Sequence, residues 1–193
     1  MKPSSAFLLA PPLPARETED PWHGTVQGCV RSRDDVTLSS LPRARYRSAL
    51  EIGGGIGLLT EKLQARCDAL LSLETSDSAQ ARAIHRCRHL SHVRFQQLSV
   101  PERYPEQTFD LTLVSGRGAW WSLPELALAQ QRILEHLEPG GHLVLVHWTG
   151  QTRDMRCSGH EVHDSFRRLA PKRLRHLRGE MEGTWRLDVF ERL

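Results

Sequence analysis

The sequence predicts an α/β protein built on a doubly wound, mostly parallel sheet of seven strands that ends in an antiparallel hairpin. Three observations support this fold class. Short apolar runs alternate with helical stretches between residues 47 and 148. A glycine-rich turn, residues 53–57, joins the first apolar run to the first helical stretch. Near the C-terminus, residues 174–181 and 185–190 are separated by Glu182-Gly183-Thr184, which is typical of a hairpin turn.

Each element follows from a local pattern in the sequence. The continuous apolar run Leu70-Leu71-Ser72-Leu73 is typical of a parallel strand buried on both faces. Thr75-Ser76-Asp77 offers helix N-cap residues, and Glu138-Pro139-Gly140-Gly141 is a stop signal for the long helix before it. The expected strands are residues 47–52, 68–74, 93–100, 109–114, 142–148, 174–181 and 185–190, and the expected helices are residues 31–41, 58–67, 78–90, 123–137 and 159–169.

Length and composition indicate one domain without a strong excess of positive or negative charge. A chain of 193 residues is long enough for a normal hydrophobic core. We expect residues 1–20, which contain three closely spaced prolines, to be a flexible tail, and residues 21–193 to form the domain. The apolar patch at residues 6–10 is too short to span a membrane. The net charge of +3, with scattered arginines, does not favour nucleic acid as a partner.

Cysteine and histidine spacing gives no sign of a metal centre. The four cysteines are widely separated and form no C-x-x-C motif, so neither a zinc site nor a disulfide framework is indicated, and a reducing cytoplasm fits. His85 and His89 lie one turn apart on an expected helix, but no third ligand joins them. We therefore expect no bound metal.

The glycine-rich turn is the strongest functional signal. Glu51 is followed by Gly53, Gly55 and Gly57, giving the pattern E-x-G-x-G-x-G between a strand and a helix. Glycine allows positive φ angles and lets a ligand approach the backbone closely. The dinucleotide fingerprint would place its third glycine at position 58, where this chain has leucine. An NAD-dependent oxidoreductase is therefore a weaker interpretation.

This pattern resembles motif I of the class I S-adenosylmethionine (SAM) methyltransferases. A wider set of segments is similar to the NodS-like methyltransferases, relatives of nodulation protein S, which methylate the amine of a deacetylated chitooligosaccharide. The segments are D-P-W-H at 20–23, T-L-S-S-L-P-R-A-R-Y-R at 37–47, A-L-E-I-G-G-G-I-G-L-L-T-E-K-L at 49–63, G-G-H-L-V-L-V-H-W at 140–148 and R-L-D-V-F at 186–190. The resemblance covers residues 20–193 and implies a Rossmann-like class I fold with strand order 3-2-1-4-5-7-6.

The resemblance also implies SAM as the cofactor and assigns residues to it. Glu74, 17 residues after Gly57, stands where the family has the acid that binds the ribose hydroxyls. Ser99 stands where an aspartate accepts the adenine amino group; a hydroxyl accepts this bond more weakly. The three alternating glycines complete the cofactor-binding set. Glu51 is expected to order the loop rather than to contact the ligand.

On the substrate side, the resemblance points to the loop after the fourth strand and to the end of the fifth. We expect Arg117, Trp120 and Trp148 to contact the acceptor. His147 is the candidate general base, with a histidine packed at a strand end as the alternative. The family usually has a glutamate at position 116, where this chain has Gly116, and a cysteine at position 54, where it has Gly54.

Two functions follow as hypotheses. The first is a cytoplasmic SAM-dependent methyltransferase that acts on the nitrogen, or less readily the oxygen, of a small amino-sugar-like metabolite. The second is a non-catalytic protein with a methyltransferase fold that serves as a partner or scaffold. The glycine loop and Glu74 favour the first, and Gly116 and Ser99 favour the second. A homodimer or a protein partner is compatible with either.

Overall fold

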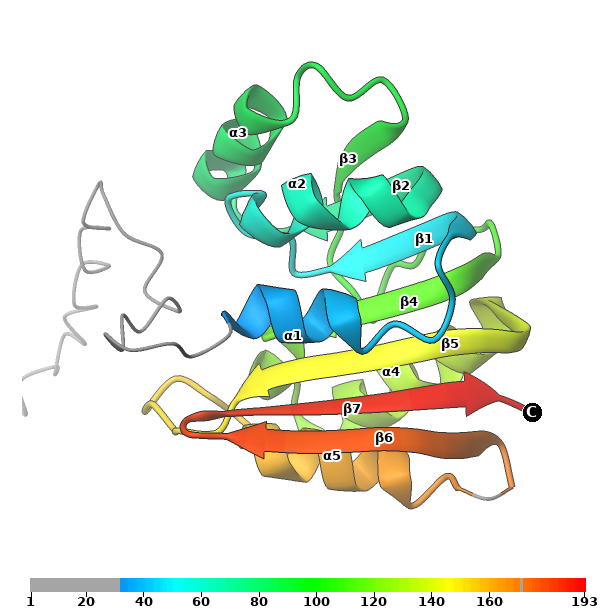
Figure 1. The fold of residues 1–193 in the computed structure, drawn as a ribbon. Coiled ribbons are helices and arrows are strands. Elements are labelled where there is room, and N and C mark those ends of the chain that lie inside the picture. Colours follow the sequence, from blue (N-terminus) through cyan, green and yellow to red (C-terminus); the bar gives the residue numbers. More distant parts are fainter. Residues whose placement is uncertain (1–31, 171) are drawn as a thin grey trace, which may run out of the picture.

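A computed structural model of the chain describes residues 32–170 and 172–193. The expected tail at residues 1–20 and the D-P-W-H motif at residues 20–23 lie outside the described residues. The described residues form one seven-stranded sheet with helices on both faces (Figure 1). Its strand order is β3-β2-β1-β4-β5-β7-β6, which confirms the predicted order and fold class.

The elements occur in the predicted sequence along the chain. The strands are β1 (Tyr46–Ile52), β2 (Cys67–Glu74), β3 (Val93–Gln97), β4 (Phe109–Ser115), β5 (Leu137–Trp148), β6 (Leu174–Glu182) and β7 (Trp185–Arg192). The helices are α1 (Arg33–Ser39), α2 (Leu58–Leu63), α3 (Asp77–Arg86), α4 (Leu123–His136) and α5 (Gly159–Arg167), with short 3-10 turns η1 (Gln64–Arg66) and η2 (Arg117–Trp120). Strands β1 to β5 pair in parallel, and β7 runs antiparallel to both β5 and β6.

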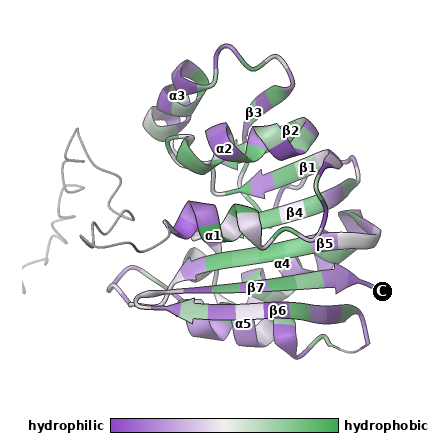
Figure 2. Ribbon diagram, viewed as in Figure 1, coloured by the Kyte–Doolittle hydropathy of each residue, from purple (hydrophilic) through white to green (hydrophobic). Residues whose placement is uncertain are grey.

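Two hydrophobic cores cover the two faces of the sheet. Successive residues of a strand point to opposite faces, so Ala49 joins the core beneath α2 while Leu50 joins the core beneath α4. Figure 2 shows that the central strands β4 and β5 are largely hydrophobic, whereas helices such as α3 carry hydrophilic residues beside hydrophobic ones. The sheet is thus buried on both sides at its centre, as the continuous apolar runs predicted.

Several boundaries differ from those predicted. β3 ends at Gln97 rather than at residue 100 because its single neighbour, β2, ends opposite it at Glu74. β5 begins at Leu137, five residues earlier than expected. Leu137 pairs with Phe109, and the register then shifts so that His142 pairs with Leu111. The Pro-Gly-Gly segment that ends α4 therefore forms an irregularity inside the ladder instead of a separate loop.

Asp110 joins β4 to the start of β1. Its carboxylate is almost fully buried and accepts hydrogen bonds from the backbone N–H groups of Arg47 (3.0 Å) and Ser48 (2.9 Å). Arg43 lies 3.7 Å from the same carboxylate. Asp110 stands at the amino end of β4, opposite the edge that carries the glycine loop, so we assign it to the fold and not to the functional site.

Candidate functional site at the carboxyl edge of the sheet

The predicted site residues gather at one edge of the sheet, where the parallel strands end. The glycine loop follows β1, Glu74 ends β2, Ser99 follows β3, and Trp148 ends β5. Residues 115–121, called here the β4 loop, follow β4. In Figure 1 this edge lies where the arrowheads of β1 and β5 point. Ligands of doubly wound α/β proteins bind at this edge, beside the point where strand order reverses, here between β1 and β4.

The glycine loop is pressed between the β4 loop and α3. Gly53 has φ 89°, and a Cβ atom on it would lie 2.3 Å from the backbone oxygen of Ser115. Gly57 has φ 83°, and a Cβ atom there would lie 2.9 Å from the Cα atom of Ala83 in α3. Gly55, with φ 54°, has no neighbouring atom within 4 Å of its Cβ position. The loop is thus fixed on two sides and open at Gly55, where a ligand has room to approach.

Glu74 faces this open position. Its Oε2 atom accepts a hydrogen bond from the N–H of Gly55 (2.9 Å), and its Oε1 atom accepts from the N–H groups of Thr75 (2.7 Å) and Ser76 (3.0 Å). A carboxylate oxygen has two lone-pair directions, so Oε2 retains acceptor capacity beyond the bond from Gly55. Open backbone at Gly55 beside this carboxylate fits a ligand that brings hydroxyl donors, such as a ribose.

Glu51 stabilises the glycine loop from the protein interior. It is fully buried, and its Oε2 atom accepts hydrogen bonds from the hydroxyls of Thr60 (2.5 Å) and Ser72 (2.8 Å). Burial raises the pKa of this carboxyl group above its usual value, although the two hydroxyls oppose the shift. Glu51 links β1 to α2 and β2, which agrees with the interpretation that it orders the loop.

Gly54 packs so tightly against Ser72 that a side chain would break the Ser72–Glu51 bond. A Cβ atom on Gly54 would lie 2.0 Å from the Ser72 hydroxyl oxygen. We expect Gly54→Ala to lower the free energy of unfolding by about 1–3 kcal/mol because the hydroxyl must rotate away and leave Glu51. In the Ser72→Ala background the substitution should cost much less, since the next atoms, Oε2 of Glu51 and the Cβ of residue 72, lie at 3.2 and 3.4 Å.

Urea unfolding of the two single variants and the double variant measures this coupling. Strictly additive losses would show that the two positions do not interact.

Ser99 lies at the outer end of the site. Its side chain is exposed, and its hydroxyl donates to a carboxylate oxygen of Glu102 (3.4 Å) within the turn that follows β3. Sequence reasoning missed Glu102, although the S-x-x-E spacing at 99–102 was visible. The structure therefore places a carboxylate next to the serine that replaces the family's aspartate.

The β4 loop contacts the glycine loop directly. The Cβ of Arg117 lies 3.3 Å from the Cβ position of Gly53. Gly116 has φ 68° and open space around its Cβ position, so the backbone there favours glycine. Trp120 is half-buried, while Trp121 is buried and donates its indole N–H to the oxygen of Val100 (2.8 Å). Arg117 and Trp120, together with Ser115, are thus the side chains of this loop that remain partly accessible beside the glycines.

The two predicted residues of β5 differ in accessibility. Trp148 is half-buried, and its ring lies against Gly150, whose Cβ position is 2.0 Å from a ring carbon. His147 is buried, with 1% of its surface exposed, and both of its ring nitrogens are engaged. Nε2 accepts from the N–H of Gly118 (3.1 Å), and Nδ1 contacts Nε2 of His163 (3.1 Å). Neither nitrogen is free to reach a substrate in this arrangement, which favours the alternative interpretation, a histidine packed at a strand end, while the role of general base stays a prediction.

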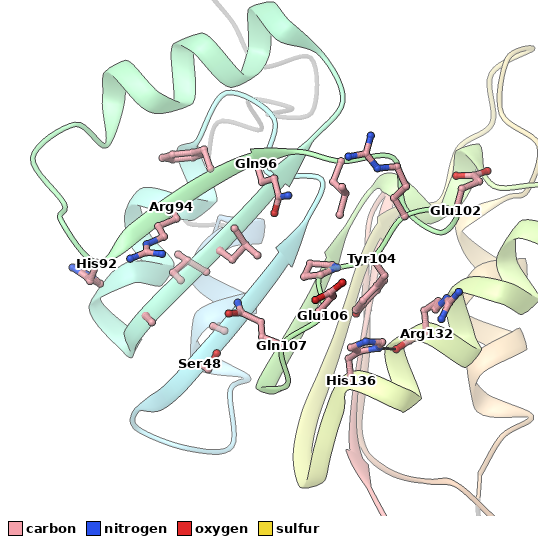
Figure 3. Close-up of a pocket in the computed structure, with 18 of the residues that line it drawn as sticks. Ser48, His92, Arg94, Gln96, Glu102, Tyr104, Glu106, Gln107, Arg132 and His136 are labelled. Carbon is pink, nitrogen blue, oxygen red and sulfur yellow. Dashed lines mark hydrogen bonds between the residues drawn. The ribbon is translucent and has the colours of Figure 1, made fainter.

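A hollow of about 1070 Å³ lies elsewhere, on the sheet face beside β1, β2 and β3 (Figure 3). Its lining includes Leu71, Arg94, Tyr104 and His136, and neither the glycine loop nor Glu74 contributes to it. None of the predicted site residues lines it, although Glu102, the hydrogen-bond partner of Ser99, does. In the part of the chain that the structure describes, no helix has the length and apolar character needed to cross a membrane, and no group of three or more potential ligands is placed to hold a metal ion.

Comparison with known proteins agrees with this geometry. Residues 49–141 match the family model described as a methyltransferase domain. Nodulation protein S of Rhizobium tropici is 31% identical over 141 residues, which cover 72% of this chain and 58% of that protein. The corresponding protein of Sinorhizobium fredii is 29% identical over 143 residues, covering 72% and 63%. The chain thus spans about three fifths of the length of these curated relatives.

Solved structures show the same fold. A Pseudomonas syringae protein described as a methyltransferase has a TM-score of 0.72 at 29% identity, with 82% of this chain and 96% of that chain covered. The N-methyltransferase NodS of Bradyrhizobium japonicum, solved with S-adenosyl-L-homocysteine (SAH), has a TM-score of 0.69 at 22% identity, covering 81% and 82%. The family match, the curated relatives and the shared sheet together show that the chain has the class I methyltransferase fold, carries a methyltransferase domain match over residues 49–141 and is similar to nodulation protein S.

Proposed function

We propose that this protein transfers the methyl group of SAM to the amine of a small amino-sugar-like metabolite in the cytoplasm. One observation carries the proposal: the glycine loop is held open at Gly55 directly opposite the carboxylate of Glu74. The curated relatives support it, since both are nodulation protein S. The free, buried state of Cys67, Cys87 and Cys157 agrees with a reducing compartment.

In this proposal the chain binds and orients its two substrates. SAM supplies a methyl group that its sulfonium centre already makes electrophilic. The carboxylate of Glu74 accepts hydrogen bonds from the ribose hydroxyls, and the hydroxyl of Ser99 accepts one from the adenine amino group. The backbone at Gly53 and Gly55 lets the cofactor approach the loop closely. Holding two reactants in line lowers the barrier by about 7–11 kcal/mol, which makes alignment the main task of the protein.

The acceptor side is formed by Arg117, Trp120 and Trp148. Aromatic rings provide flat apolar surface on which a sugar face can stack. The nitrogen must be uncharged to attack, and residues 115–121 contain no side chain that titrates near neutral pH. His147 is engaged in the interior. We therefore propose that the amine loses its proton to water before transfer.

Calorimetric titration with SAH tests the proposal. We expect micromolar affinity for the unaltered chain and a loss of about tenfold to a hundredfold for Glu74→Ala, because the hydroxyls of the ligand lose a charged acceptor. Glu74→Gln, which retains one acceptor oxygen, should fall between the two. Glu135→Ala is the control, since Glu135 is exposed on α4.

Each outcome of this titration has a distinct meaning. Unchanged affinity in Glu74→Ala would show that Glu74 does not bind the ribose. Absence of binding by the unaltered chain at millimolar ligand would contradict the proposed function and favour the non-catalytic partner or scaffold. If binding is found, labelled SAM with glucosamine oligomers tests the acceptor class. Transfer to hydroxyl acceptors alone would change the assignment from nitrogen to oxygen.

A further inference from the structure

A chain of buried hydrogen bonds runs from the C-terminal hairpin to the β4 loop. Asp188 on β7 contacts Nδ1 of His163 on α5 (2.7 Å). Nε2 of His163 contacts Nδ1 of His147 on β5 (3.1 Å), with the two rings nearly perpendicular at 86°. Nε2 of His147 contacts the backbone N–H of Gly118 in η2 (3.1 Å). Each of the three side chains is at most 1% exposed. We call these three residues the His-His-Asp relay.

Which atom donates and which accepts in every hydrogen bond of the relay follows from the backbone N–H of Gly118, at the end of the relay. The N–H of Gly118 can only donate, so Nε2 of His147 carries no proton. A neutral His147 then carries its proton on Nδ1 and donates to Nε2 of His163. His163 in turn carries its proton on Nδ1 and donates to the carboxylate of Asp188. The relay therefore has one polarity throughout, with Asp188 fixing the tautomer of both rings.

The relay holds the β4 loop by its backbone. A Cβ atom on Gly118 would lie 2.7 Å from Nε2 of His147, so this close approach requires glycine. The same loop contributes the Ser115 oxygen and the Arg117 Cβ that lie against Gly53. A displacement of Gly118 is thus transmitted within a few residues to the surface that faces the glycine loop.

We propose that His147, His163 and Asp188 are positioning residues for methyl transfer, which hold the β4 loop in register with the glycine loop only while both imidazoles are neutral. The proposal rests on the proposed function in one respect, that the β4 loop borders the acceptor. The three residues exchange no proton with the substrate and form no covalent bond with it.

The charges around the relay keep it in this state near neutral pH. Burial lowers the pKa of His147 well below its usual range, and His163 and Arg33 of α1 add to the effect. Burial also lowers the pKa of His163, opposed by Asp188 and Asp164 and assisted by Arg186. The surroundings of Asp188 comprise His163, Arg186, His176 on β6 and, at 4.0 Å, Arg167.

Protonation of either histidine breaks hydrogen bonds of the relay. A proton added to Nε2 of His163 would face the N–H of His147, and a proton added to Nε2 of His147 would face the N–H of Gly118. Because both native pKa values lie below the unfolded value of about 6.5, the unfolded chain binds more protons below that pH. The contribution of the two histidines to stability is therefore constant above about pH 6.5 and falls as the pH decreases further, whereas the hold on Gly118 is lost only at the lower pH at which the native imidazoles themselves take up protons.

Two substitutions at His163 distinguish the effect of its hydrogen bonds from the effect of its protonation. The amide of His163→Gln can accept from His147 and donate to Asp188, but it cannot be protonated. His163→Leu has similar bulk and does neither. His176→Gln is the matched control, since His176 contacts the other oxygen of Asp188 and lies outside the line to Gly118.

The experiment uses nitrogen-15-labelled full-length chain. NMR of the imidazole nitrogens of the unaltered chain reports the tautomer directly, and amide exchange reports the hold on Gly118. We expect His147 to carry its proton on Nδ1. We also expect Gly118 to exchange about tenfold faster in His163→Leu, as for the loss of one hydrogen bond, and unchanged in His163→Gln and His176→Gln.

Kinetics give the second readout. In His163→Leu we expect kcat to fall about tenfold while SAH affinity changes less than about threefold, since the loop aligns the acceptor more than it binds the cofactor. In His163→Gln we expect kcat to be retained near neutral pH and the acid limb of the profile to move to lower pH.

A proton on Nε2 of His147 in the unaltered chain would overturn the proposal, as would unchanged Gly118 exchange in His163→Leu. Should His163→Leu fail to fold, the wild-type tautomer and the pH profile of His163→Gln decide the matter. Failure of the unaltered chain to bind SAH would refute the proposed function instead, while tautomer and exchange still decide whether the relay holds the loop.

Discussion

Gly53→Ala is expected to abolish SAH binding and to lower the free energy of unfolding by about 3 kcal/mol or more. The φ angle of 89° lies in the left-handed region, which alone costs an L-residue about 1–2 kcal/mol. The added methyl group would also lie 2.3 Å from the backbone oxygen of Ser115, an atom at the end of β4 that cannot rotate away. Either β1 or β4 must shift, and with it the open position at Gly55.

Gly55→Ala is the matched control for this experiment. It has a similar φ angle of 54° but no atom within 4 Å of its Cβ position. We expect a loss of stability of only about 1 kcal/mol, together with a clear loss of SAH affinity, because the methyl group enters the open space of the site. Urea unfolding and calorimetry on both variants check this contrast. Equal stability losses would show that the contact with Ser115 is not tight.

Asp110→Ala is expected to be the most destabilising single change outside the glycine loop, by about 3–5 kcal/mol. The substitution leaves two partly buried backbone N–H groups, those of Arg47 and Ser48, without their acceptor at the start of β1. It also removes the carboxylate that faces the Arg43 guanidinium at 3.7 Å. An unpartnered buried donor costs the full desolvation penalty of that group.

Thermal and urea unfolding measure the effect, with two further variants for comparison. Asp110→Asn keeps one acceptor oxygen and should lose about half as much. Asp68→Ala removes an exposed carboxylate that pairs with Arg45 near the same end of the sheet, and should change stability by less than about 1 kcal/mol. Near-equal results for Asp110→Ala and Asp68→Ala would refute a structural role for Asp110.

The fold was predictable because its signals are local. The apolar run 70–73 defines a buried strand without reference to any other part of the chain. The E-x-G-x-G-x-G pattern likewise specifies a turn by the φ angles that it requires, and the structure shows positive φ at Gly53, Gly55 and Gly57. The strand order itself came from the resemblance to a known family. Pairing of Leu137 with Phe109 was missed because Pro139 and the following glycines look like a terminus when read alone.

The candidate site was only partly predictable, because some of its contacts join distant segments. The sequence placed Glu74 correctly at the end of β2 and beside the glycine loop. It offered His147 as a base because nothing near position 147 reveals Gly118 on one side and His163 on the other. The hydrogen bond between His163 and Asp188 spans 25 residues and crosses from a helix to a strand. Such partners are determined by tertiary packing, and the spacing of residues in the sequence does not predict them.

The relay lies outside the part of the chain that the family model matches. The methyltransferase domain match ends at residue 141, and His147, His163 and Asp188 all follow it. The glycine loop and Glu74 lie inside the matched residues. Replacement of the segment after residue 141 by that of a relative would therefore exchange the three residues that anchor the β4 loop and leave the sequence of the glycine loop unchanged.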